Sequence, residues 1–359
     1  MRRRIGMGIL FVALGLFVGY GTAWLASDEV RYLTRAAAEE ARILERRRSL
    51  EAVIQDPRTD GATRGLLTLV REVRGYADTL GLEAGDTYTS YSDVGRDTLL
   101  LVLTAAPKDC VCPHIWKYPI VGRVPYKGFF DPRMAQKAAS QLEQRGLDVN
   151  LRPSGAFSTL GWFNDPLLST ALSRDSLELA VTVFHELAHN TLWVQGAAAF
   201  NESFAQYAGY RSAEAFFRSR GDTLQAHRAA ERWSDEQVLA EYYRELLARV
   251  DSFYQARPDS AALDSGRVAL GRWARDQLAG PVAAQLRTFE IGPLADRPIN
   301  NARLIGVLIY RTNLAWFEAW HRRQQSDVSR ALAGLRELLK EAEGDSAFAR
   351  LERAVSPER

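Results

Sequence analysis

The stretch Val181–Tyr207 constrains the fold more than any other, because an H-E-x-x-H motif at residues 185–189 lies inside an apolar run. The run predicts a buried helix, and helical residues four positions apart project from one face, one turn from each other. His185 and His189 can therefore direct two imidazoles at a single metal ion. Glu186 lies about 100° around the helix from His185, where a carboxylate can take a proton from water beside the ion.

An ordinary solvated helix can also carry two histidines and a glutamate, so the flanking residues decide between the two interpretations. Here they are apolar, and buried histidine and glutamate side chains must be paired or must bind a metal. Zinc fits best, since imidazole and carboxylate suit it and a catalytic zinc site keeps one position open for water. The apolar flanking residues are Phe184, Leu187, Ala188, Leu192 and Trp193.

Glu202 is the best candidate for a third ligand. Gly196 predicts the end of the first helix, and a helical pattern resumes over 197–217. Two helices joined by a short turn pack antiparallel, which returns Glu202 towards His185 and His189. The alternative is that Glu202 is a first-turn acid favoured by the helix dipole. The sequence therefore predicts one zinc ion held by His185, His189 and Glu202.

At these residues the sequence resembles the gluzincin metallopeptidases, especially zinc aminopeptidases with HELAH and NE-x-FA motifs, which match residues 185–189 and 201–205. It resembles more closely a predicted bacterial aminopeptidase family of membrane-attached proteins, over nearly the whole chain after the N-terminal segment. One departure is that only 12 residues separate His189 from Glu202, fewer than in classical gluzincins. The segments that carry the closer resemblance are 118–122, 126–131, 157–167 and 300–303.

The resemblance implies a zinc-dependent peptidase, with aminopeptidase activity inferred from kinship. It also implies a gluzincin-like domain with a small mixed β-sheet, within a chain whose patterns are predominantly helical, so the predicted class is α+β. In gluzincins the strand before the metal helix pairs with the extended substrate. By resemblance Ser158–Trp162 takes that role, and an ordinary edge strand is the alternative.

The N-terminus predicts a membrane anchor. Ile5–Ala26 is a run of 22 uncharged residues, long enough to span a bilayer, and Arg2, Arg3 and Arg4 precede it. Those arginines predict that the N-terminus stays in the cytoplasm and that the bulk of the chain is exported. A cleaved signal peptide is the rival interpretation. We therefore expect a single-pass protein of the bacterial inner membrane, with its catalytic domain on the periplasmic side.

Charge argues against a nucleic-acid partner. The three N-terminal arginines are the only charges before Asp28, so the rest of the chain has 46 − 3 = 43 basic and 44 acidic residues. The chain after residue 4 therefore has no excess of positive charge with which to bind nucleic acid. The expected partners are a peptide substrate and the membrane, while the oligomeric state stays open.

Three regions follow from the patterns along the chain. Residues 1–26 form the anchor, residues 27–85 a helical lead-in packed on the catalytic domain, and residues 86–359 that domain. Residues 94–97 lie between β-prone runs and predict a hairpin. Near the C-terminus, Asn300 or Asn301 is suited to cap one long apolar helix over Ala302–Arg322.

The two cysteines, Cys110 and Cys112, are separated by one residue. In an exported domain they can pair, although a bridge over so short a loop stabilises little. A metal site with His114 is disfavoured, because the usual ligand spacing is missing.

The predicted mechanism gives Glu186 the roles of general base and then general acid. The oxyanion needs a second electrophile besides zinc, and tyrosine commonly supplies it. Tyr207 is five residues beyond Glu202 and points about 140° away on the same helix, whereas Tyr310 is favoured by analogy with aminopeptidases whose tyrosine comes from a later helix. The further candidates are Tyr126 and Tyr210.

Three functional classes stay open. An aminopeptidase needs a polar or acidic group to hold the free amine of its substrate, and no such residue is identified. A metalloendopeptidase would use the same chemistry in an open cleft. A helical membrane-bound protein without metal would keep the fold, although a complete motif with Glu202 argues against it. His227 and His321 are expected at the surface, on charged helices.

Overall fold

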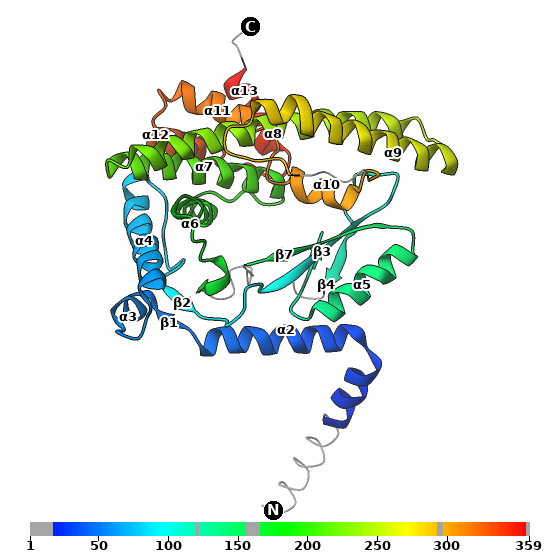
Figure 1. The fold of residues 1–359 in the computed structure, drawn as a ribbon, viewed down its shortest axis with the longest axis horizontal. Helices are drawn as coiled ribbons and strands as arrows, with labels where there is room; N and C mark the ends of the chain where they lie inside the picture. Colours follow the sequence, from blue (N-terminus) through cyan, green and yellow to red (C-terminus); the bar gives the residue numbers. More distant parts are fainter. Residues whose placement is uncertain (1–16, 119–121, 156–165, 293–296, 357–359) are drawn as a thin grey trace, which may run out of the picture.

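The computed structural model describes residues 17–118, 122–155, 166–292 and 297–356. The described part is predominantly helical with small β-sheets, so the predicted α+β class is confirmed (Figure 1). A layer of long helices forms the upper side of the view, α6 lies beneath that layer, and the strands lie below α6 (Figure 1).

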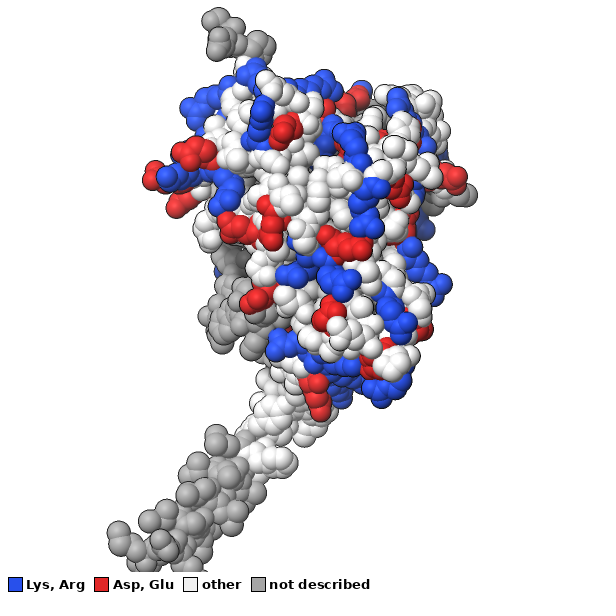
Figure 2. Space-filling view, turned by 90° about the vertical axis from the view of Figure 1, so that its left-hand side faces the viewer, with Lys and Arg blue, Asp and Glu red and all other residues white. Residues whose placement is uncertain are grey.

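The described N-terminal residues lead away from the body of the molecule. Residues 17–26 are helical, carry no charged side chain and protrude from the body (Figures 1 and 2). Most of the predicted span Ile5–Ala26 lies outside the described residues. Within the described ranges, no helix is both long enough and apolar enough to cross a membrane.

The lead-in helix α2 (Asp28–Glu45) lies along the opposite side of the strands from α6 (Figure 1). Ser27 caps it by accepting a hydrogen bond from the backbone N–H of Val30. Lys137 Nζ lies 2.8 Å from Asp28, and Lys127 Nζ lies 2.6 Å from Glu29, which ties the start of α2 to the strand region. The other lead-in helices are α3 (Leu50–Gln55) and α4 (Gly61–Ala77).

The strands form three small sheets in the described part of the chain. The first is mixed, because β2 pairs antiparallel with β1 and parallel with β8. The second is antiparallel in the order β6-β3-β7, and β4 pairs with β5 in the third. The strands are β1 (Arg48–Ser49), β2 (Ser90–Ser92), β3 (Leu100–Ala106), β4 (Trp116–Tyr118), β5 (Gly122–Val124), β6 (Lys127–Phe129), β7 (Asp148–Ser154) and β8 (Leu167–Leu168).

The hairpin predicted around residues 94–97 is wrong. The strands on either side, β2 and β3, belong to different sheets. Ser169 Oγ accepts a hydrogen bond from the backbone N–H of Val94, and Arg46 donates to the carbonyl of Asp93. These contacts with distant segments hold the connection in place of strand pairing between its two ends.

The remaining helices make up most of the upper layer, with α5 on the far side of the antiparallel sheet (Figure 1). Helix α5 ends just before Gly146, which takes a φ of 81° ahead of β7. The helices are α5 (Pro132–Gln144), α6 (Ser176–Thr191), α7 (Ala198–Ser219), α8 (Thr223–Gln255), α9 (Ser260–Gln277), α10 (Asn301–Leu308), α11 (Leu314–Arg323), α12 (Val328–Leu338) and α13 (Ser346–Val355).

The single long helix predicted over Ala302–Arg322 is divided in two. Asn300 caps the start as expected, by accepting a hydrogen bond from the N–H of Arg303. Helix α10 nevertheless ends at Leu308, and Asn313 takes a left-handed φ of 53° before α11 begins. Ser203 of α7 holds the segment between the two helices through hydrogen bonds. The local sequence does not encode these contacts.

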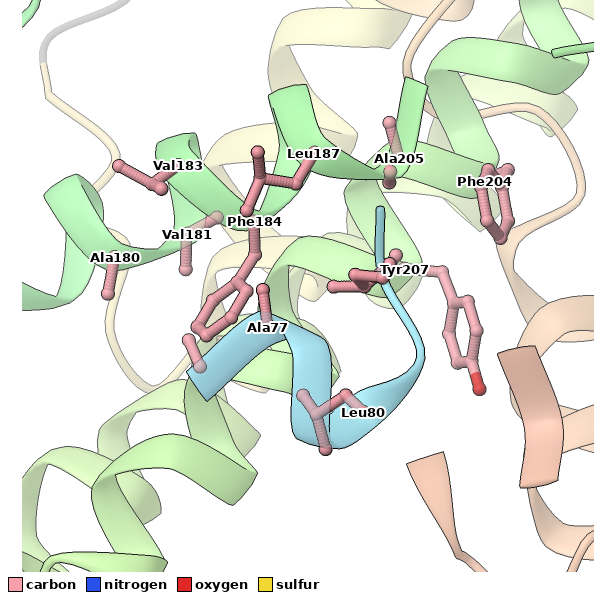
Figure 3. Close-up of a cluster of buried hydrophobic side chains, with 14 of the residues drawn as sticks. Ala77, Leu80, Ala180, Val181, Val183, Phe184, Leu187, Phe204, Ala205 and Tyr207 are labelled. Atoms are coloured by element: carbon pink, nitrogen blue, oxygen red, sulfur yellow. The ribbon is translucent and has the colours of Figure 1, made fainter. Parts of the chain in front are cut away.

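The main core surrounds α6. Figure 3 shows Phe184 and Leu187 of α6 beside Ala77 of α4 and Ala205 of α7, and all four side chains are fully buried. Burying a large apolar side chain stabilises a fold by roughly 1.5–3 kcal/mol. Packing of this kind holds the motif helix on several sides and leaves the face that carries its histidines half-buried.

The structure also tests the expected exposure of two histidines and the possible pairing of the two cysteines. The expectation that His321 lies at the surface is wrong, because only 4% of it is exposed and its Nδ1 lies 2.9 Å from the hydroxyl of Tyr207. His227 is exposed on α8, as expected. Cys110 and Cys112 form a disulfide with each other.

Candidate metal centre

Helix α6 presents the two histidines of the motif side by side. Asp175 caps the helix by accepting hydrogen bonds from the N–H groups of Leu177 and Glu178. One turn apart on the half-buried face of α6, His185 Nε2 and His189 Nε2 lie 3.2 Å from each other. Two ring nitrogens at that separation can both coordinate one metal ion.

The connection to α7 brings Glu202 back to that point. Gly196 takes a φ of 74°, a conformation that glycine adopts without steric cost. Asn201 then closes the turn, because its side-chain amide accepts from the N–H of Val194 and donates to the carbonyl of Val194, each at 2.9 Å. Asn201 is 1% exposed. The N-E pair thus has two tasks: Asn201 closes the loop and Glu202 faces the histidines.

The three candidate ligands converge as the sequence predicted. One donor atom from each of His185, His189 and Glu202 lies within 4.8 Å of the others. His185 Nε2 is 3.4 Å from one carboxylate oxygen of Glu202, and His189 Nε2 is 3.8 Å from the other. The 12 residues between His189 and Glu202 therefore suffice to bring all three together.

These separations fit a small tetrahedral cation. Bonds of 2.0–2.2 Å in a tetrahedron place neighbouring ligand atoms about 3.3–3.6 Å apart. The 3.2, 3.4 and 3.8 Å observed lie close to that spacing. Two imidazoles and one carboxylate are the donor set of a catalytic zinc site, in which water takes the fourth position. The residues present thus fit one zinc ion.

The protonation states also suit a cation. Burial, followed by the charge of His185, lowers the pKa of His189 to about 4, so its imidazole is neutral at neutral pH. Burial raises the pKa of Glu202, but a hydrogen bond from His185 and the charges of His189, His185 and Arg152 outweigh it, so the pKa falls below the usual range. A neutral imidazole and an ionised carboxylate are the forms that bind metal.

Close packing of two helices fixes the distance between the histidines and Glu202. Gly209 of α7 faces α6 so closely that a Cβ at this position would lie 2.9 Å from the carbonyl oxygen of Val181 and 3.5 Å from Cβ of His185. Glycine is therefore required for the approach of the two backbones.

We expect Gly209→Ala to lower the free energy of unfolding by about 1–2 kcal/mol, because overpacking costs more than the gain in helix propensity. The same change should weaken zinc binding, since His185 moves with α6. Urea unfolding and zinc titration measure the two effects.

Gly65→Ala on α4 is the matched control, because a Cβ at this position would meet nothing within 4 Å. It should stabilise the protein by roughly 0.5–1 kcal/mol. Equal stabilisation by both changes would contradict the packing argument.

Of the tyrosines considered, Tyr310 lies nearest to the centre by ring contact. Its ring centroid is 6.3 Å from that of His185. Burial, followed by the charge of Glu202, raises the pKa of Tyr310 to about 12, so its hydroxyl keeps its proton. Tyr126 lines the same cavity as Tyr310 and Glu202. Tyr126, Tyr310 and Glu202 therefore border one common space.

Tyr207 and Tyr210 point elsewhere. Tyr207 is fully buried within the main core (Figure 3). Its hydroxyl forms a hydrogen bond with His321 Nδ1. Tyr210 packs against Trp233, with 6.2 Å between ring centroids. Tyr207 therefore lies away from the three donors, in line with the 140° expected from the helix geometry.

Three contacts that the sequence did not predict hold the segment carrying Tyr310. Ser203, the neighbour of Glu202, donates to the carbonyl of Ile309 at 3.4 Å and accepts from the N–H of Thr312 at 3.1 Å. Arg311 lies 2.7 Å from the buried carboxylate of Glu236. Helix α7, through Ser203, and helix α8, through Glu236, thereby hold the segment that carries Tyr310.

A cavity of about 220 Å³ opens next to Glu202, one of the three donors. Glu202, Tyr126, Tyr310 and Arg152 contribute its polar groups, together with hydroxyls of β3 and β7. Arg152 was not singled out in the sequence, because a lone arginine near the end of a strand carries no signal. The predicted substrate strand Ser158–Trp162 lies outside the described residues.

Comparison with known proteins bears on these residues directly. The sequence model of a family described as "Putative aminopeptidase" matches residues 31–347. The chain belongs to this family. Searches of curated proteins and of solved structures found no match. The part that matches the aminopeptidase family contains His185, His189, Glu202 and Tyr310, so the candidate centre lies wholly inside it.

Proposed function

We propose that the protein is a membrane-attached zinc peptidase of the gluzincin type that removes N-terminal residues from peptides. The convergence of His185, His189 and Glu202 on one point carries the proposal. Zinc, when bound there, supplies a Lewis acid that polarises the scissile carbonyl and acidifies water. Membership of the family supports the choice of an aminopeptidase.

Glu186 moves the proton. It follows His185 on α6, so its carboxylate lies around the helix from the metal ligands, and its charge contributes to the raised pKa of Tyr310. In the proposed reaction Glu186 accepts a proton from the attacking water and gives it to the leaving amine. One carboxylate thus serves as base and then as acid.

Tyr310 stabilises the developing negative charge. Its hydroxyl keeps its proton at neutral pH, because its pKa is raised to about 12, chiefly by burial. It can therefore donate a hydrogen bond to the carbonyl oxygen of the scissile bond as that oxygen becomes an oxyanion. Tyr126 lines the same cavity and is the alternative donor.

Matched substrates test the exopeptidase assignment. Aminoacyl fluorogenic amides and the same compounds with an acetylated N-terminus are offered to the purified, zinc-loaded full chain. The proposal expects hydrolysis of the free-amine compounds and little hydrolysis of the blocked ones. Cleavage of blocked peptides alone would assign a zinc endopeptidase instead. A chain that takes up no zinc and hydrolyses neither compound would support a structural role.

Attachment to the membrane forms a second part of the proposal. In the described part of the apolar segment, Phe17 is 75% exposed and Leu25 is 73% exposed, so these side chains have no protein surface to cover them. The Cys110–Cys112 disulfide suits an oxidising compartment. We therefore place the catalytic domain on the periplasmic side of the inner membrane. Detergent-dependent release from membranes, together with protease digestion of spheroplasts, tests this placement: release without detergent, or protection of the domain, would contradict it.

A further inference from the structure

The cavity beside Glu202 lies between the antiparallel sheet and α10. In the register of β3 and β7, Arg152 is opposite Val102 and Ser154 is opposite Leu100, so these four residues share one face of the sheet. All four line the cavity, and Ile305 of α10 and Ile309, just beyond the end of α10, close it from the other side. Arg152 thus stands on a rigid strand, in a mostly aliphatic pocket that opens onto Glu202.

Arg152 keeps its guanidinium available to a ligand. It is exposed, and over the described ranges no carboxylate lies within 4.0 Å of it. The other end of the same strand shows a contrast: Asp148 is paired with Arg267 at 2.7 Å, and both residues are buried. A structural arginine of β7 would be expected to have such a partner, and Arg152 has none among the described residues.

The charges of the lining residues determine which chemical group of a ligand is favoured in the cavity. Glu202 and Arg152 are the only charged residues among the described lining residues. With a divalent cation on Glu202 the cavity is net positive, so the free amine of a peptide is disfavoured there. A carboxylate is favoured, since the planar guanidinium can hold it through two hydrogen bonds.

We propose that Arg152 is a specificity-determining residue that binds a carboxylate of the peptide substrate close to the scissile bond. This inference rests on the proposed peptidase function and names its substrate class: peptides that carry a negative charge next to the bond that is cut. The carboxylate has two possible sources, the free C-terminus of a dipeptide and an acidic side chain beside the bond. Arg152 holds the substrate and takes no part in the proton transfers.

Paired substrates that differ only in charge test the proposal. Alanyl-alanine is compared with alanyl-alanine amide for the C-terminal source, and glutamyl with glutaminyl p-nitroanilide for the side-chain source. In the substrate pair whose charged member supplies the bound carboxylate, Arg152→Met should raise KM for that charged member about 10- to 100-fold with little change in kcat. KM for the neutral member should stay as it is, and Arg152→Lys should recover part of the loss.

Arg133→Met is the matched control, because Arg133 is exposed on α5 and does not line the cavity. It should leave both pairs unchanged. Equal effects of Arg152→Met on charged and neutral substrates would indicate a structural role and overturn the proposal. An effect on neither pair, in an enzyme that hydrolyses both, would overturn it as well while leaving the peptidase function intact.

Binding separates failure of this inference from failure of the peptidase function. If the wild-type chain hydrolyses none of these substrates, calorimetric titration of zinc-loaded wild type and Arg152→Met with the same pairs still measures the preference. Tighter binding of the charged member, lost in Arg152→Met, would support a carboxylate site in a protein that is not a peptidase. Equal affinity for both members in the wild type would overturn the site.

Discussion

Replacing Glu186 with Gln is expected to lower kcat by about 10²- to 10⁴-fold, the usual worth of a positioned general acid–base group. The amide keeps the size of the side chain but cannot accept the proton of the attacking water. Glu186 is not one of the three converging ligands, so the zinc content should stay unchanged. Steady-state kinetics together with elemental analysis of the same samples measures both quantities.

Glu178→Gln provides the control on the same helix. Glu178 lies in the first turn of α6, where it pairs with Arg232 at 3.6 Å, away from the three donors. This change should leave kcat and zinc content as they are. Undiminished turnover by Glu186→Gln would remove the proposed mechanism, and a loss of zinc from that variant would make Glu186 a ligand.

Replacing Tyr310 with Phe is expected to lower kcat by about 10²- to 10³-fold with little change in KM. The lost hydroxyl bonds to the oxyanion of the transition state more strongly than to the neutral carbonyl of the bound substrate, so the effect falls on the chemical step. Measurement of kcat and KM over a range of substrate concentrations separates the two parameters.

Tyr207→Phe is the companion variant. It removes the hydrogen bond with His321 from the interior and should reduce the free energy of unfolding by about 1 kcal/mol. Its kcat should stay unchanged. If instead Tyr207→Phe impaired catalysis and Tyr310→Phe did not, the assignment of the oxyanion donor would be reversed; an unaffected Tyr310→Phe alone would direct attention to Tyr126.

The sequence predicted that His185, His189 and Glu202 converge, because the determinants of this convergence are local. His185 and His189 are one turn apart, so a helix alone brings them together. Gly196 and a short connection were enough to infer that α7 returns, and Glu202 then falls opposite the histidines. The capping residue Asn300 likewise marked the start of α10.

What the sequence did not predict depends on partners far along the chain. Ser203 holds Ile309 and Thr312, more than 100 positions away, and so interrupts a helix that its own apolar pattern made continuous. The charged helix around His321 predicted a surface position, but His321 is buried against Tyr207 and forms a hydrogen bond with its hydroxyl. Arg152 acquires meaning only from the register of β7 against β3 and from the cavity that this face lines.

Zinc stoichiometry tests the central claim most directly. The full chain and its His189→Ala and Glu202→Ala variants are purified, stripped with a chelator, and dialysed against a mixture of zinc, manganese and magnesium. Elemental analysis should then find one zinc per wild-type chain and far less in either variant, while circular dichroism shows that the variants remain folded. A wild-type chain that retains no zinc, or folded variants that retain as much as the wild type, would contradict the account.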